Sequence, residues 1–172
     1  MITCERLKGA YSEGEALAIY NEVKQYDDFL GFAKEFMHNE DYQVARNALW
    51  GLTKATNKEL SPLQIILDDL IDLAMQTDNS SVRRLSLNLI ERLKMEEEDL
   101  RTDFLDFCLE HMSSIEEYPG IQSLCMKLAF RICKFYPELM DELKRTIEAM
   151  EIDYYKPAVK NIRSRILNKK IK

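Results

Sequence analysis

The chain is poor in glycine, proline, histidine and tryptophan. Its 172 residues include five Gly, four Pro, two His and one Trp. So few turn residues argue against long loops and against strand-rich folds, which need many turns. No run of about 18 apolar residues occurs, so the sequence predicts no membrane span. The N-terminus lacks the apolar core of a secretory signal. We expect a single domain over residues 1–172.

Sequence motifs of catalysis and cofactor binding are also missing. The two histidines, His38 and His111, belong to no HExxH motif and to no close Cys/His set, so no metal is predicted. Neither a glycine-rich phosphate loop nor a GxSxG motif occurs. We therefore expect no enzyme activity and no cofactor. The four cysteines form no CxxC pair, and three of them lie in apolar helical patterns. This usage predicts reduced, buried thiols in a cytoplasmic protein.

What the sequence does contain is an apolar register that returns every 38 or 39 positions. The register residues are Val44, Val82, Ile121 and Val159, and each opens a helix-like stretch. A fixed period of this size indicates stacked helical repeats, an architecture that usually offers a binding surface.

Each period is predicted to form two helices, called A and B here. Apolar residues at i, i+3, i+4 and i+7 predict A helices over 27–38, 62–76, 99–112 and 137–150. In the second of them, Ile65, Ile66 and Leu70 are assigned to the buried face. The B helices are predicted to start near residues 41, 80, 119 and 157. The expected repeats are 26–58, 60–95, 97–136 and 137–172. Residues 1–25, with a helix over 12–25, are expected to cap the first repeat. Almost no strand is expected.

The sequence Asp78-Asn79-Ser80-Ser81-Val82-Arg83-Arg84 carries a family resemblance, and residues 40–46 carry it more loosely. A helix pair near 38 residues, with a short polar turn leading into Val-Arg, resembles the HEAT repeat family. The resemblance covers residues 26–172, although Gln122 and Lys160 replace the arginine in the third and fourth units. It implies an all-α, right-handed α-α superhelix (a HEAT-like solenoid) of four hairpins. The B helices would line its concave side.

The segment from Pro137 to Lys170 also resembles the tail of short bacterial HEAT-like proteins, some of which carry the label adenylosuccinate lyase. That label implies catalytic histidines and a mobile, serine-rich catalytic loop that contains glycine. This chain has neither.

Charge separates by helix type. The four B segments (42–58, 80–95, 121–136, 156–172) hold 17 Lys or Arg and one acid, Glu91. The four A segments with their turns (27–41, 60–79, 96–120, 137–155) hold 24 Asp or Glu and four basic residues.

The basic residues of the B segments also keep the register. Offsets of 2, 6 and 10 from the register residue fall on one helical stripe opposite the apolar offsets. The residues of this stripe that we assign to partner binding are Arg46, Trp50, Lys54, Arg84, Asn88, Arg92, Lys127, Arg131, Arg165 and Lys169. Two interpretations stay open: a basic groove, or the solvated side of each helix with cations placed to suit the helix dipole. Trp50 is either an anchor for a partner or a packing residue.

Two functions fit this pattern. The first is a non-catalytic interaction module whose basic concave surface binds an acidic or extended protein partner. The second is nucleic-acid binding, because TDNSSVRRLSL (77–87) resembles a repeat of HEAT-like DNA glycosylases that act on alkylated bases. Those enzymes pair groove aromatics with a carboxylate, whereas here Trp50 and Glu91 are far apart in sequence. The net charge of −6 also favours the first function.

Overall fold

The apolar register forms helices where the sequence predicts them. The computed structural model describes residues 1–169, and over that range it contains helices and turns but no strand. All four register residues are buried, and Leu49, Leu87 and Met126 at offset 5 are buried as well. At the same offset in the fourth repeat, Ser164 is exposed. The expected all-α class, built from paired helices, is confirmed.

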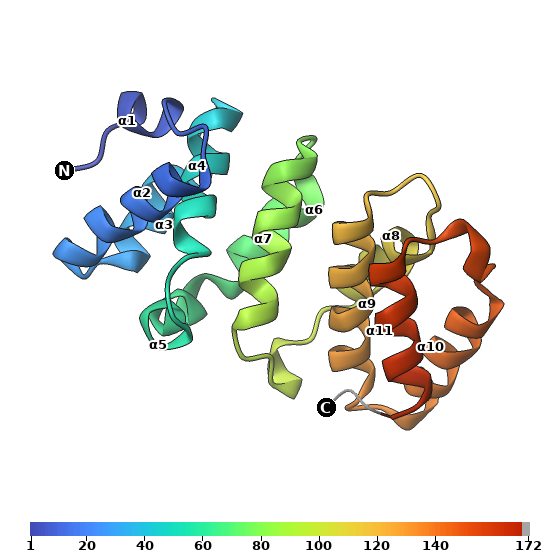
Figure 1. The fold of residues 1–172 in the computed structure, drawn as a ribbon. Helices are drawn as coiled ribbons and strands as arrows, with labels where there is room; N and C mark the ends of the chain where they lie inside the picture. Colours follow the sequence, from blue (N-terminus) through green and yellow to red (C-terminus); the bar gives the residue numbers. More distant parts are fainter. Residues whose placement is uncertain (170–172) are drawn as a thin grey trace. The chain divides into compact units, whose positions relative to one another are not determined.

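The helices form two compact units, Met1–Lys94 (unit 1) and Met95–Lys172 (unit 2). In unit 1, the first A–B hairpin is α3 (Phe29–Phe36) with α4 (Tyr42–Leu52), and the second is α6 (Leu67–Gln76) with α7 (Ser80–Arg92). The two B helices α4 and α7 pack against each other. In unit 2, the hairpins are α8 (Thr102–Ser113) with α9 (Pro119–Cys133) and α10 (Pro137–Ala149) with α11 (Pro157–Leu167). There α9 packs against both α8 and α11 (Figure 1).

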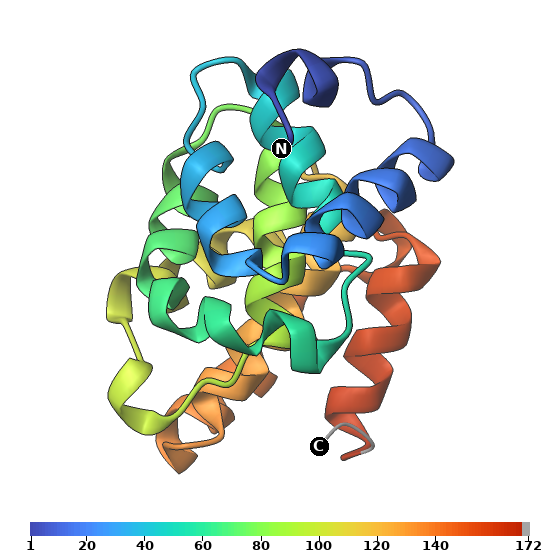
Figure 2. The same cartoon turned by 90° about the vertical axis from the view of Figure 1, so that its left-hand side faces the viewer.

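Two N-terminal helices pack on α4. The helix expected over 12–25 is α2 (Glu13–Tyr26), which begins at a capping box of Ser12 and Glu15. A short helix that the sequence did not predict, α1 (Cys4–Lys8), lies beside α4 (Figure 2). The Nζ of Lys8 lies 2.8 Å from Oδ2 of Asp41 at the start of α4. Both helices therefore cover the apolar side that the first hairpin would otherwise expose.

The second A helix departs from its predicted course. Residues 57–66 form a short helix, α5 (Asn57–Leu60), followed by a 3₁₀ helix, η1 (Ser61–Ile66), so that α6 begins only at Leu67. A 3₁₀ helix has three residues per turn, and side chains at i and i+3 share a face. Leu63 and Ile66 are therefore buried, whereas Ile65 is 78% exposed. The assignment of Ile65 to the buried face was wrong because it assumed an α-helical period.

The third A helix also starts later than predicted. The helix predicted from residue 99 is preceded by an acidic run at 96–99 that forms a separate 3₁₀ turn, η2 (Glu97–Asp99). Glu96 N–H donates to Oδ2 of Asp99 at 2.9 Å and closes this turn. The chain then extends through Leu100 and Arg101 before α8 begins at Thr102. A further 3₁₀ turn, η3 (Ile152–Tyr154), precedes α11.

Side chains from the B helices close the C-terminal ends of the A helices. Arg83 Nε donates to the carbonyl of Ala74 at 2.8 Å, next to the end of α6. Gln122, at the same register offset, donates to the carbonyl of Ser114 at 2.5 Å beyond α8. These bonds satisfy carbonyls that a helix end leaves without partners. Gln122 of the third repeat therefore makes a bond of the same kind as Arg83, from a side-chain donor to a carbonyl at the end of the preceding A helix.

Candidate functional site

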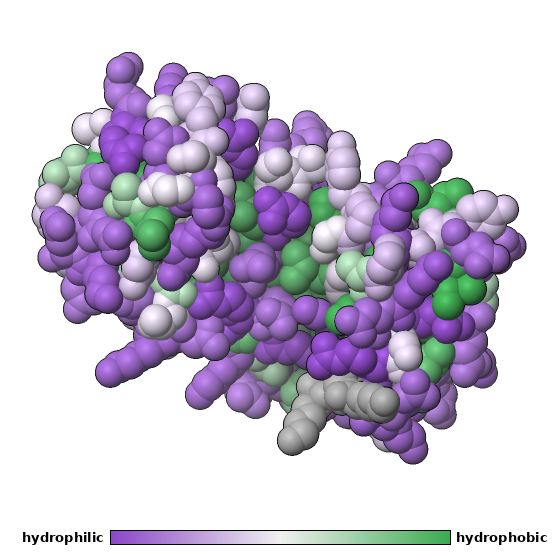
Figure 3. Space-filling model, in the orientation of Figure 1, coloured by the Kyte–Doolittle hydropathy of each residue, from purple (hydrophilic) through white to green (hydrophobic). Residues whose placement is uncertain are grey.

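The predicted stripe divides between the two units. The unit 1 stripe comprises Arg46, Trp50 and Lys54 from α4 and its C-terminal end, and Arg84, Asn88 and Arg92 from α7. None of the six is buried. The apolar offsets on the same helices are buried, including Leu52 and Ile90. The surface of unit 1 seen in Figure 3 is mostly hydrophilic, with scattered hydrophobic residues.

Arg46 is held in place by two neighbours. Its guanidinium carbon lies 6.0 Å from the ring centroid of Tyr42, one helical turn earlier, which is a cation–π distance. Its Nε donates to Oδ1 of Asn47 at 3.0 Å. Asn47 is fully buried and donates in turn to the carbonyl of Leu7 at 2.6 Å. The buried Asn47 amide and the Tyr42 ring therefore both orient Arg46.

Trp50 follows Arg46 by one further turn. Its side chain is half-buried, and its indole N–H donates to none of the described residues. Arg84 on α7 stands at the register offset of Arg46; it is exposed and has no ion-pair partner within residues 1–169. A large aromatic surface, an unused N–H donor and an unpaired guanidinium are the groups that a binding surface offers to a partner.

Lys54 is less available than its position in the sequence suggests. Its Nζ forms an ion pair with Oε1 of Glu13, at the start of α2. The Lys54 side chain is 23% exposed and the Glu13 side chain 70% exposed. Sequence reasoning missed Glu13 because its segment lies outside the repeats, and no periodic signal links the two positions. The pair lowers the net positive charge at this end of the stripe.

Arg92 is committed to holding the backbone. Its Nη1 donates to the carbonyl of Thr53 at 2.8 Å, its Nη2 to the carbonyl of Ala55, and its Nε to Oδ1 of Asn57 at 3.0 Å. Burial lowers the pKa of Arg92, but a guanidinium stays protonated at any physiological pH. Arg92 therefore fixes the segment between α4 and α5, and its substitution would disturb the fold as well as the surface.

In unit 2, the predicted residues lie on α9 and α11. Lys127 and Arg131 are half-buried on α9, one turn apart, and Arg165 is exposed on α11. Lys169 lies beyond the end of α11 with a left-handed backbone (φ 56°). Since α9 and α11 pack side by side, these cations belong to neighbouring helices of one unit. That the stripes of the two units form a single surface remains a prediction.

Both histidines lie within hydrogen-bond distance of a carboxylate. His38 Nε2 lies 2.8 Å from Oδ1 of Asp69 in unit 1, and His111 Nδ1 lies 2.6 Å from Oε2 of Glu117 in unit 2. Over residues 1–169, no group of three or more His, Cys, Asp or Glu is arranged to hold a metal ion.

Three of the four cysteines, Cys108, Cys125 and Cys133, are buried, and Cys4 is exposed; all four are free thiols. Burial raises the pKa of Cys108 and raises that of Cys133 to about 11. These two side chains are therefore neutral thiols at physiological pH.

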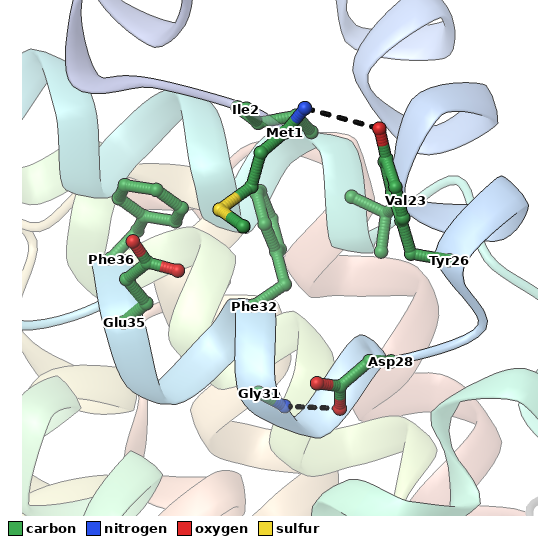
Figure 4. Close-up of a pocket in the computed structure, with 9 residues that line it drawn as sticks. All are labelled: Met1, Ile2, Val23, Tyr26, Asp28, Gly31, Phe32, Glu35 and Phe36. Atoms are coloured by element: carbon green, nitrogen blue, oxygen red, sulfur yellow. Dashed lines mark hydrogen bonds between the residues drawn. The ribbon is translucent and has the colours of Figure 1, made fainter.

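A recess in unit 1 lies away from the stripe. It encloses about 420 Å³ between the N-terminal residues, α2 and α3, and its lining includes Phe32, Phe36, Val23 and Glu35 (Figure 4). The N-terminal ammonium donates to the hydroxyl of Tyr26 at 3.1 Å and closes one side. The lining offers apolar contact and carboxylates, which suits an apolar group that carries a positive charge.

A family model described as a HEAT repeat domain matches residues 3–170. No curated protein and no solved structure matches the chain. The resemblance of the tail to proteins labelled adenylosuccinate lyase stays a prediction. None of the described helices has both the length and the apolar composition needed to cross a bilayer.

Proposed function

Because the chain belongs to the HEAT repeat family, we propose that it is a non-catalytic interaction module. It binds an acidic or extended protein partner on the basic side of its B helices. The observation that carries this proposal is the pair formed by Arg46 and Trp50, one turn apart on α4 and neither of them buried. Arg84 on the adjacent α7 adds an exposed guanidinium.

The mechanism has two steps. Cations on the B helices attract an acidic partner over distances comparable to the Debye length, which raises the association rate. Trp50 then supplies a large apolar contact and one N–H donor, and slows dissociation. Arg46 binds with little loss of side-chain entropy because Asn47 and Tyr42 already orient it.

The structure of unit 1 supports a protein partner over nucleic acid. Glu13 is ion-paired to Lys54 within the stripe, and Arg92 is used by backbone carbonyls. Few cations are left for the several phosphate contacts on which nucleic-acid affinity depends. A gel shift with duplex DNA at low salt separates the two functions: a salt-dependent complex would favour nucleic acid.

The proposed location is the cytoplasm, where thiols stay reduced. The four free cysteines support it.

The test removes two cations of the stripe that donate to no backbone carbonyl of residues 1–169 and leaves Arg92, which holds the backbone. The double variant Arg46→Glu/Arg84→Glu and the single variant Trp50→Ala should each lose the proteins that the full-length chain captures from a cell extract. The matched control is Lys34→Glu, an exposed residue of α3 on the acidic A side. Circular dichroism checks that each variant keeps its helices.

Arg92 is left out of this test because it holds the backbone. An unchanged capture profile in the double variant, measured by quantitative mass spectrometry, would contradict the proposal. An equal loss in Lys34→Glu would contradict it as well, since the effect would then not belong to the stripe.

A further inference from the structure

The two A–B turns of unit 2 lie side by side and are fixed to each other. The first joins α8 to α9 (residues 114–118), and the second joins α10 to α11 (residues 150–156). Tyr155, which is 8% exposed, donates its hydroxyl to the carbonyl of Ser113 at 2.6 Å. Burial raises the pKa of Tyr155, so the hydroxyl remains a donor at physiological pH. The surface formed by the two turns is therefore fixed by a partly buried hydrogen bond.

Large apolar side chains are exposed on both turns. Ile115 is 60% exposed, Tyr118 62%, Ile152 41% and Tyr154 64%. Between the turns lies an open hollow of about 590 Å³, with Ile115, Met150 and Tyr154 in its lining. Of the four exposed side chains, Ile115 and Tyr154 line this hollow, one from each turn. Single exposed apolar residues are common on protein surfaces, but apolar residues that gather at a hollow are typical of an interaction site.

The repeat architecture does not require these apolar residues. In unit 1, the corresponding turns are residues 37–41 and 77–79. Their one large apolar side chain, Met37, is fully buried, so these turns expose no aliphatic or aromatic hydrocarbon side chain. Those turns cap the next helix through polar side chains, as Asn79 does by accepting from the backbone N–H of Val82 at 3.0 Å. The turns of unit 2 begin their helices with proline instead, at Pro119 and Pro157. The apolar residues therefore need an explanation other than helix capping.

The two turns beside the hollow carry mostly negative charge. Acidic side chains flank the apolar ones in both turns, and Lys156 is the one basic residue of the two turn segments. The acids are Glu116, Glu117, Glu151 and Asp153. Glu117 is paired with His111 at 2.6 Å, whereas Glu116, Glu151 and Asp153 are exposed. An occupant of this surface must therefore bring positive charge beside an apolar group.

We propose that this surface, the unit 2 turn patch (Ile115, Glu116, Tyr118, Glu151, Ile152, Asp153 and Tyr154), docks a basic segment of another protein. An aliphatic or aromatic side chain of that segment enters the hollow between Ile115 and Tyr154. Lysine or arginine side chains on either side of it contact Glu116, Glu151 and Asp153. The ring of Tyr154 offers a face for a guanidinium. The partner of this patch is basic, whereas the partner proposed for the B-helix stripe is acidic. The chain would therefore bridge two different partners.

The experiment measures the anisotropy of a fluorescein-labelled amphipathic peptide built from Lys, Leu and Ala, titrated with the full-length chain. One variant, Ile115→Ser/Tyr154→Ser, removes the apolar contact of the patch. A second variant, Glu151→Lys/Asp153→Lys, reverses its negative charge. Each should weaken binding about tenfold or more, as loss of a central anchor does. A second peptide, with Ser in place of Leu, should bind the unmodified chain only weakly. Its affinity should match that of the first peptide for the two variants.

Matched controls carry the same kinds of change in unit 1. Ile65→Ser removes an exposed apolar residue, and Glu40→Lys reverses an exposed charge; both should bind the Lys-Leu-Ala peptide like the unmodified chain. Equal weakening in the controls, equal binding of the two peptides, or no binding to the unmodified chain would overturn the proposal. Self-association of the chain that Ile115→Ser/Tyr154→Ser abolishes in light scattering would also overturn it, in favour of a second copy as the occupant.

Discussion

Asn47 shows how one residue can depart from the repeat pattern for a physical reason. The corresponding positions in the other repeats are Leu85, Leu124 and Ile162, so the pattern alone predicts an apolar side chain there. Asn47 is fully buried, yet it accepts from Arg46 and donates to the Leu7 carbonyl of α1. A buried amide is tolerated when both of its ends have hydrogen-bond partners.

The first prediction concerns this amide. Asn47→Leu should lower the free energy of unfolding by about 1–3 kcal/mol. The substitution removes the amide donor, so the buried carbonyl of Leu7 loses its hydrogen bond to this side chain. Urea unfolding followed by circular dichroism measures the change. Asn88→Leu is the control, since Asn88 is half-buried at a surface offset and should change stability by less than about 0.5 kcal/mol. A variant Asn47→Leu as stable as the unmodified chain would contradict the prediction.

The candidate site could be predicted from the sequence only as a set of positions. The register correctly separated the buried offsets, such as Val44 and Leu85, from the surface offsets of Arg46 and Arg84. It could not show that Lys54 is ion-paired with Glu13, because that contact depends on how α2 packs on α4. The backbone contacts of Arg92 were equally invisible, since backbone carbonyls leave no sequence signal.

At the scale of the helix, periodicity predicted which segments are helical better than where each helix begins. The B helices start within two residues of their predicted positions, marked by Asp41, Asn79 and two prolines. The second and third A helices start late because 3₁₀ segments precede them. A 3₁₀ turn and an α-turn differ by less than one residue per turn. A short apolar run such as 62–66 therefore fits both.

The close packing of α2 on α4 depends on Gly51. A Cβ at this position would lie 2.6 Å from Cγ2 and 3.2 Å from Cβ of Ile19 on α2. Glycine in a helix costs about 1 kcal/mol relative to alanine, so its presence in α4 indicates that packing outweighs helix propensity. Ile19 is fully buried and β-branched, so its side chain has little freedom to move away.

The second prediction follows from that contact. Gly51→Ala should destabilise the chain by about 1–3 kcal/mol despite the better helix propensity of alanine, because the added methyl group overpacks the α2–α4 contact. In the background of Ile19→Ala, where the space is open, the same substitution should become neutral or stabilising. A double-mutant cycle of urea unfolding measures the coupling between the two sites. Additive effects would show that the contact with Ile19 does not explain the glycine.

At the scale of the whole molecule, charge carries more information than composition suggests. A net charge of −6 in 172 residues looks ordinary, but acids dominate the A segments and bases dominate the B segments. The register placed both sets on helices of known type, so their division between the two kinds of helix was predictable. The grouping of the repeats into two compact units was not predictable, because the register spacing is 38 residues within each unit and 39 between them, and a difference of one residue does not mark a boundary.

Carboxylates with a lowered pKa, within the described range, are concentrated in unit 1. The pKa of Glu15 is lowered chiefly by the backbone N–H of Tyr11, that of Glu59 by the backbone N–H of Thr56, and that of Asp41 by Lys8. In unit 2, the pKa of Asp103 is lowered by its hydrogen bond with Arg101. Two of the unit 1 carboxylates, Glu15 and Glu59, take part in capping boxes. Their ionisation is therefore coupled to the helix starts of unit 1.

The third prediction is that acid destabilises unit 1 before unit 2. A carboxyl whose folded pKa lies below its unfolded value of about 4 contributes stability above that value and loses it as the pH falls through the folded pKa. Hydrogen exchange on the full-length chain should therefore show amides of α1, α2 and α4 losing protection between about pH 5 and pH 3, ahead of those of α9 and α11. Asp41→Asn should lower stability near neutral pH and match the unmodified chain in acid. Asp78→Asn, at an exposed turn residue, is the control. Simultaneous loss of protection in both units, or an Asp41→Asn effect that persists in acid, would show that Lys8 and Asp41 do not stabilise α1 on α4 through their charges.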